Sequence, residues 1–204
     1  HHARETLGAA LNGVTDNPLI FDDAILSGGN FHAQPLAFIS DYLAIAAAEI
    51  ASMSERRTDL LDRRVNPALS MFLTTEPGLE SGFMIAHVTA AALTSENRTL
   101  AHPASIDNVT TSAGQEDHVS MAPWAGFKLQ RICENTAHVL GVELLAAAHA
   151  IDKMQPLQTT EPLQRVHAFV RRHVEYRPYD HRLDREIATL ATLIADGALG
   201  EFLT

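Results

Sequence analysis

The stretch HAQPLAFISDYLAIAAAEIASMSERRTDLLDRR, residues 32–64, decides the fold. Its apolar residues recur at alternating spacings of three and four, the spacing of one face of an α-helix. They are Leu36, Ile39, Leu43, Ala46, Ile50, Met53 and Leu60. Alanines surround this stripe, and a helix that is apolar on several sides is usually buried among other helices. The pattern predicts one long helix from His32 to about Arg64.

The same periodicity predicts helices in the rest of the chain. The expected ranges are 82–100, 123–154, 162–176 and 184–196, and residues 1–14 resemble the end of a helix. Pro103 and Pro156 follow the first two of these helices, and Thr160 is the expected cap of the third. Turn residues around Asn17-Pro18 make 15–30 an ordered loop or a small hairpin. The sequence therefore predicts an all-α fold with long helices side by side.

Composition excludes several classes of partner. The net charge is -10, which argues against nucleic acid and against an anionic membrane surface. No apolar run approaches the roughly 20 residues that a membrane span needs, and we expect no signal peptide at the start of the chain. The single cysteine, Cys133, excludes an internal disulfide, so we expect a cytoplasmic protein. The chain lacks an initial Met, and we interpret it as a fragment or a processed chain.

A polar stretch, TSAGQEDHVSM at 111–121, separates two of the predicted helices. It has no helical period, and Gly114 favours a turn. Glu116, Asp117 and His118 form either an acid/base group or a solvated cluster, and spacing alone favours the solvated cluster.

Other catalytic patterns are weak. Asp117, His118 and Ser120 lack the Gly-x-Ser-x-Gly turn of hydrolases, and Gly28-Gly29 lacks the lysine of a phosphate loop. No histidine pair has the spacing of a zinc helix, so we expect no metal.

Several motifs occur in order over about residues 10–155 and together form a specific pattern. They are Thr15-Asp16-Asn17-Pro18-Leu19, Ser27-Gly28-Gly29-Asn30-Phe31-His32-Ala33, Ser54-Glu55-Arg56-Arg57, Ser81-Gly82-Phe83-Met84-Ile85-Ala86 and the stretch 111–121. With these motifs the chain resembles the histidine ammonia-lyase family, within the aromatic amino-acid lyases. The resemblance implies a long-helix bundle of the ammonia-lyase/fumarase type. It also implies a homotetramer whose active sites draw on more than one subunit.

The family's electrophile is 4-methylidene-imidazol-5-one, which forms from an Ala-Ser-Gly tripeptide. That tripeptide is absent from these residues, since Ala51-Ser52 is followed by Met53 and Ala104-Ser105 by Ile106. The resemblance places the tripeptide in an N-terminal half that this chain lacks. We therefore expect no electrophile from this chain, and no activity from it alone.

The resemblance assigns roles to four residues. Phe31 matches an aromatic residue beside the electrophile and the substrate. Glu116 matches an acidic residue that faces the substrate in histidine lyases, and we expect it to be the catalytic residue, which orients the substrate or assists proton transfer. Met84 and Gln115 are expected in the pocket wall. A carboxylate suits an imidazole or an ammonium group, so Glu116 favours L-histidine as the substrate.

Three positions depart from the family pattern. Gly114 replaces a usual Asn, His87 a usual Gln, and Glu80 a usual Asn. Together they are compatible with a relative that acts on another amino acid.

The first hypothesis is thus the C-terminal part of a lyase that converts L-histidine to urocanate and ammonia. Residues 1–155 would form the central bundle with the active-site loops, and 156–204 the C-terminal helices. A second hypothesis is a helical oligomerisation module without catalysis. A third is a lyase of the fumarase and aspartase type. The stretch Ser120-Met121-Ala122-Pro123 resembles the signature loop of that type only in part.

Overall fold

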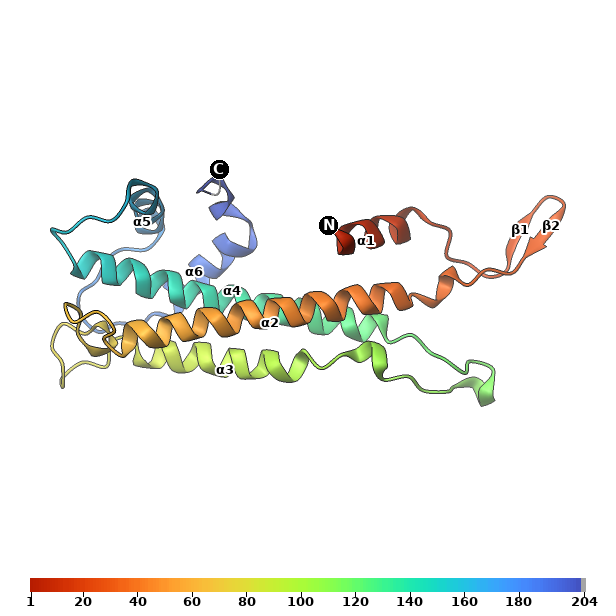
Figure 1. Cartoon of the computed structure of the whole chain (residues 1–204), viewed down its shortest axis with the longest axis horizontal. Coiled ribbons are helices and arrows are strands. Elements are labelled where there is room, and N and C mark those ends of the chain that lie inside the picture. The colour runs from red at the N-terminus through yellow and green to blue at the C-terminus, as the bar shows by residue number, and fades with distance from the viewer. Residues whose placement is uncertain (203–204) are drawn as a thin grey trace. The chain divides into compact units, whose positions relative to one another are not determined.

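The computed structural model describes residues 1–202, which form helices with one short β-hairpin (Figure 1). The helices are α1 (His2–Asn12), α2 (Gln34–Asp62), α3 (Met84–Leu100), α4 (Ala122–Lys153), α5 (Glu161–His173) and α6 (Asp184–Ala195). The strands are β1 (Leu19–Phe21) and β2 (Ala24–Leu26). Short 3-10 turns are η1 (Asn30–His32), η2 (Met71–Leu73), η3 (Ala104–Ile106), η4 (Ser112–Gly114) and η5 (Ala198–Phe202). The all-α prediction is confirmed.

The chain divides into two compact units, and α2, α3 and α4 each contribute to both. Unit 1 comprises residues 1–47 and 99–132, and unit 2 comprises residues 48–98 and those from 133 onward. These boundaries lie inside helices, because a long helix can supply different faces to different neighbours along its length. The division of the chain at residue 155 is a separate matter and stays a prediction.

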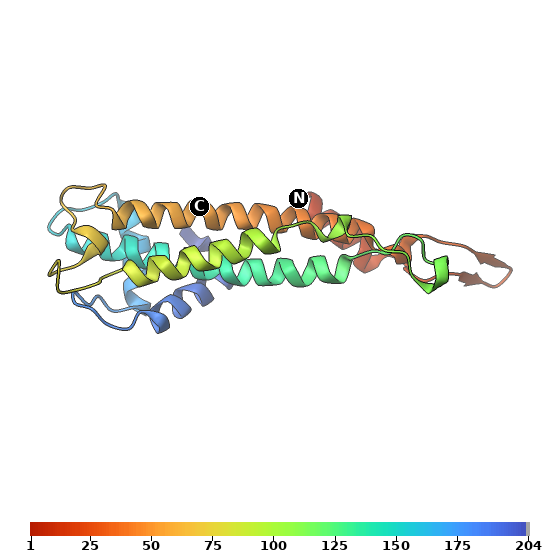
Figure 2. The ribbon, with the colours of Figure 1, turned by 90° about the horizontal axis from the view of Figure 1, so that it is seen from below.

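Unit 2 holds the larger core. The C-terminal half of α2 runs beside α3 and the C-terminal half of α4 (Figures 1 and 2). Alanines at the contacts allow close helix approach, and larger side chains fill the remaining space. The core includes Ala51, Ala86, Ala90, Val139, Val142, Leu145, Ala146, Val170 and Leu190. A Cβ at Gly141 would lie 3.1 Å from the Ile187 carbonyl oxygen, so glycine lets α6 pack against α4.

Unit 1 carries the hairpin and the polar loop. Strands β1 and β2 pair antiparallel with Leu19 opposite Leu26, so of the two alternatives for 15–30, an ordered loop or a small hairpin, the structure has the hairpin. A small core joins Ala37 of α2, Ala104 of η3 and Ala125 of α4. Because these residues are small, the loop that contains Ala104 can lie close to both helices.

Helix boundaries agree with the sequence except at one end. The helix expected to reach Tyr176 ends at His173, because Val174 is extended while its amide still donates to the Val170 carbonyl. Thr160 occupies the predicted cap position, but its hydroxyl makes no capping hydrogen bond. Its carbonyl accepts from the Gln164 amide at 2.9 Å.

One segment, Asn30–Asp62, is long and apolar enough to cross a membrane by length and composition alone. The core helices of soluble proteins pass the same test, and 33% of its most apolar window is buried within the chain. Buried charged residues, including Asp41 and Glu55, also lie within the apolar sequence of this helix.

Candidate functional site

The polar loop of unit 1 folds into a tight left-handed turn. Thr111 and Glu116 form an isolated antiparallel bridge, with the Thr111 amide donating to the Glu116 carbonyl at 2.9 Å. Between them Ser112, Ala113 and Gly114 have φ of 49°, 54° and 89°. Left-handed backbone at non-glycine residues is strained, and such strain often occurs at functional sites.

Gly114 shows how one departure from the family pattern fits this turn. Its φ of 89° lies where glycine is favoured and asparagine is among the better tolerated residues. A Cβ added at Gly114 would meet nothing within 4 Å. The exchange of Asn for Gly is therefore compatible with the same turn.

The Glu116 side chain folds back toward the start of its loop. Its Oε2 accepts hydrogen bonds from the hydroxyls of Thr111, at 2.6 Å, and Ser112. These two bonds lower the pKa of Glu116, and the bond from Ser112 has the larger effect. Glu116 is consequently an anion at neutral pH, suited to orienting a cationic group and poorly suited to accepting a proton. Its neighbour Gln115 is exposed and ends η4.

Two buried charged residues hold the base of this loop. Lys128 of α4 donates from Nζ to the His102 carbonyl and lies 3.9 Å from Asp41 Oδ1. Asp41 of α2 accepts at Oδ2 from the Ser105 amide at 2.7 Å. Both side chains are about 5% exposed, so these contacts fix the loop where it leaves the helices.

Phe31 lies in η1, directly before α2, and is 54% exposed. The next residue, His32, reaches the loop, with its Nε2 at 2.6 Å from the His118 carbonyl oxygen. The rings of His32 and His118 are stacked at 5.1 Å. Unit 1 therefore links the segments that contain three predicted site residues, Phe31, Gln115 and Glu116.

Met84, the fourth predicted site residue, belongs to unit 2 and begins α3. The turn before it is closely defined, because Gly82 has φ of 55° and a Cβ there would lie 2.2 Å from the Phe72 carbonyl oxygen. Asp180 accepts from the amides of Ser81 and Gly82, both at 2.8 Å. A carboxylate at this position satisfies donors at the start of α3 and suits the positive end of its dipole.

The second departure, Glu80, bonds the same region from the other side of the sequence contact, because it accepts from the Asp180 backbone. Its Oε2 accepts from the amides of Thr75 and Glu76 at 2.8 Å, and its Oε1 from the Asp180 amide at 3.1 Å. These backbone donors lower the pKa of Glu80. A carboxylate offers two acceptor oxygens for these donors where an asparagine offers one.

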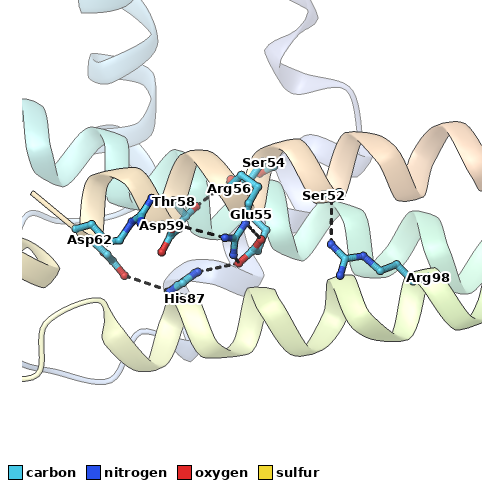
Figure 3. A network of polar contacts seen from close by, with 10 residues as sticks. Ser52, Ser54, Glu55, Arg56, Thr58, Asp59, Asp62, His87 and Arg98 are labelled. Atoms are coloured by element: carbon cyan, nitrogen blue, oxygen red, sulfur yellow. Dashed lines mark hydrogen bonds and ion pairs between the residues drawn. The ribbon is translucent and has the colours of Figure 1, made fainter. Parts of the chain in front are cut away.

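The third departure, His87, belongs to a buried polar cluster between α2 and α3 (Figure 3). His87 Nε2 lies 2.8 Å from Glu55 Oε1, and its Nδ1 lies 3.8 Å from Asp62 Oδ2. The pKa of Glu55 is lowered, and the largest cause is its side-chain hydrogen bond with Arg56. Asp62 is 1% exposed, and burial raises its pKa to about 6. His87 thus joins two buried carboxylates of α2 from across the helix interface.

The chain's two Ala-Ser pairs do not fit the electrophile. Ser52 lies within α2, where its hydroxyl accepts from Arg98, and Ser105 lies in η3 with its amide bonded to Asp41. Neither pair is followed by the glycine that the cyclisation requires. The described residues also contain no group of His, Cys, Asp or Glu side chains able to hold a metal ion.

Sequence reasoning assigned no positioning role to four residues that shape these segments: His32, Asp41, Lys128 and Asp180. Asp41 and Lys128 are charged residues within apolar helices, and that contrast was an available signal. The bonds of His32 and Asp180 span 86 and 99 residues of sequence, so no local pattern announces them.

Comparison with known proteins places this architecture in a class. The chain is similar to the crystal structure of histidine ammonia-lyase from Trypanosoma cruzi, with 40% identity and a TM-score of 0.88 over 98% of this chain and 41% of that one. It is also similar to tyrosine aminomutase from Streptomyces globisporus, with 36% identity and a TM-score of 0.90 over 99% of this chain and 38% of that one. The fold is therefore the helical ammonia-lyase fold.

The family follows from sequence. The family model for aromatic amino acid lyases matches residues 1–172. The histidine ammonia-lyases of Burkholderia ambifaria and Burkholderia vietnamiensis are each 51% identical over 202 residues, 98% of this chain. The chain belongs to the aromatic amino acid lyase family. It spans 40% of the length of these curated relatives.

Proposed function

We propose that this chain is the C-terminal part of an ammonia-lyase that converts L-histidine to urocanate and ammonia. The observation that carries the proposal is the Glu116 carboxylate, which remains charged in an exposed loop tied to the Phe31 segment. The curated relatives that are 51% identical are named histidine ammonia-lyases, which supports histidine as the substrate.

In this proposal each residue acts through its own chemistry. Thr111 and Ser112 occupy Oε2 of Glu116, which leaves Oε1 for the imidazole or ammonium group of the substrate. Phe31 supplies an apolar wall, and Gln115 lines the pocket beside it. Met84 keeps the pocket-wall role that the resemblance implies, in a site that draws on more than one subunit. Because the pKa of Glu116 is lowered, its carboxylate is an anion, and in that form it orients the substrate.

The remaining parts of the site come from outside these residues. The methylidene-imidazolone would be supplied by an Ala-Ser-Gly tripeptide of the N-terminal half. We propose a homotetramer in the cytoplasm, without nucleic acid or membrane as partners. Residues 1–155 act as the central bundle with the site loops, and 156–204 as the C-terminal helices.

The proposal is tested by joining this chain to the upstream part of the Burkholderia ambifaria relative and following urocanate formation by absorbance. We expect turnover of histidine by the joined enzyme and none by the chain alone. Glu116→Gln should reduce kcat/KM roughly 100-fold or more, because a charge-assisted contact is lost. Asp117→Asn is the matched control and should retain most of the activity. Unchanged turnover in the Glu116 variant would remove that residue from the site.

A different substrate is the second candidate, because solved structures similar to this chain include an aminomutase. The joined enzyme should therefore also be assayed with tyrosine and phenylalanine. Faster ammonia release from either one than from histidine would replace histidine as the substrate.

A further inference from the structure

One side-chain contact joins the two segments of unit 1 that contain candidate site residues. His32 Nε2 lies 2.6 Å from the His118 carbonyl oxygen, and the two rings are stacked with an angle of 11° between their planes. A carbonyl oxygen only accepts hydrogen bonds, so the proton of this bond is on Nε2 of His32. His32 directly follows Phe31, and His118 comes two residues after Glu116.

The other hydrogen bonds of the loop do not hold it against the Phe31 segment. Thr110 bonds Asp117, Asn108 bonds the Val119 amide, and Thr111 bonds Glu116, so all of these stay within 108–119. The contacts of Lys128 and Asp41 reach only His102 and Ser105 at the loop base. Within residues 1–202, His32 supplies the one hydrogen bond that ties 108–119 to another segment.

This arrangement matters because the turn near Glu116 is strained. Three consecutive residues, 112–114, have positive φ, and two of them are not glycine. A strained conformation persists only where surrounding contacts favour it over the alternatives. The loop is also mostly exposed, so packing within unit 1 contributes little to that preference.

We propose that His32 is a positioning residue that holds the Glu116 loop beside the Phe31 segment, and that it does so as a hydrogen-bond donor. Its consequence for catalysis rests on the proposed function, in which Glu116 and Phe31 contact one substrate. Loss of the donor frees the loop, so Glu116 spends less time where it can meet the substrate. The stacked ring of His118 contributes contact area but does not replace the bond.

The bond itself is tested on the 204-residue chain by amide hydrogen exchange of residues 108–119. His32→Phe keeps a ring and removes the donor, and His32→Gln keeps a donor at a similar reach. We expect exchange to rise roughly three- to tenfold in His32→Phe, the range of one net hydrogen bond, and to stay near wild type in His32→Gln. His138→Phe is the matched control, because among residues 1–202 His138 bonds the Glu134 carbonyl of its own helix, at 2.9 Å, and no residue of the loop. Equal exchange in His32→Phe and wild type, or equally raised exchange in both His32 variants, would overturn the proposal.

The consequence for catalysis is measured in the enzyme joined to the upstream part of its relative. His32→Phe should raise KM for histidine roughly tenfold with a smaller change in kcat, because a ground-state contact is weakened. His32→Gln should restore KM, which a merely structural role of the ring would not predict. Raised loop exchange in His32→Phe together with unchanged KM and kcat would support the role of His32 in holding the loop. It would refute the assignment of the loop to the substrate site. Unchanged loop exchange would refute the role of His32 whatever the kinetics.

Discussion

His149 is a buried base that the proposed chemistry does not use. Its ring lies about 5 Å from the rings of Phe83 and Tyr176, and it is 7% exposed. Burial, followed by Lys153 and Arg171, lowers the pKa of His149 from 6.5 to about 4. The folded protein therefore keeps this imidazole neutral at pH values where the unfolded chain protonates it.

This difference predicts a stability that depends on pH. The contribution of neutral His149 is present above pH 6.5 and is lost as the pH falls from 6.5 toward 4, by up to about 3 kcal/mol. His149→Phe should remove most of that loss, as measured by urea unfolding at pH 7 and pH 4.5. His138→Phe, at an exposed position of the same helix, should not. An identical pH dependence in wild type and His149→Phe would contradict the prediction.

For Asp62 we expect a pH dependence of stability with the opposite sign to that of His149. Neither of its carboxylate oxygens has a hydrogen-bond partner among the described residues, and burial raises its pKa from 3.8 to about 6. The folded state then binds this proton more tightly than the unfolded chain, so the Asp62 contribution stabilises as the pH falls from about 6 to 3.8. Asp62→Asn removes the charge and should raise the free energy of unfolding at pH 7 by roughly 1–3 kcal/mol.

The matched control for Asp62 is Asp59→Asn, whose carboxylate pairs with Arg63 at 3.0 Å and is 15% exposed, against 1% for that of Asp62. Its removal should lower stability at pH 7 by less than about 1 kcal/mol. Chemical denaturation of both variants at pH 7 and pH 5 provides the comparison. A loss of stability in Asp62→Asn at pH 7 would show that the ionised carboxylate is stabilised by His87 more than burial destabilises it.

Among the elements, the start of α3 depends on one glycine. At Gly82 the φ of 55° and the 2.2 Å approach of the Phe72 carbonyl oxygen leave no room for a Cβ. Gly82→Ala should therefore cost roughly 2 kcal/mol or more, measured as a lowered unfolding midpoint. Gly126 within α4 has open space around it, so Gly126→Ala should stabilise by roughly 0.5–1 kcal/mol. Equal effects of the two substitutions would contradict this account.

The helices were predictable because their signal is local. The stripe from Leu36 to Leu60 and the prolines after the helices depend only on residues a few positions apart. The end of α5 was placed too late, since residues 174–176 continue an amphipathic pattern although Val174 is extended. Long-range contacts decide such ends, and a single sequence does not contain them.

The candidate site was predictable only in part, for the same reason. The motifs located Phe31 and Glu116, and unit 1 ties their segments through a bond across 86 residues that no spacing revealed. The two hydroxyls that bond Glu116 are local, but the left-handed turn that brings them there was not predicted. The roles of Phe31, Met84, Gln115 and Glu116 in substrate binding stay predictions until the variants are measured.

At the scale of the whole molecule, the chain exposes many large apolar side chains. Tyr42 and Phe127 are each 65% exposed, and the single tryptophan, Trp124, is 51% exposed. Exposed apolar surface of this extent is typical of protein interfaces. The proposed homotetramer would cover such surface, whereas an enzyme that works as a single chain would leave it in water.

This predicts self-association that Trp124 can report. As the chain is concentrated, its fluorescence emission should shift to shorter wavelength while sedimentation shows larger species, because the indole leaves water. Phe127→Glu should raise the concentration at which both changes occur by roughly tenfold or more, since it places a charge on an apolar contact. Leu79→Glu changes an apolar residue that is more exposed than Phe127, 80% against 65%, and lies in a loop, so it should leave association unchanged. Association that responds equally to both substitutions would indicate non-specific clustering of apolar surface and would contradict a defined interface at the start of α4.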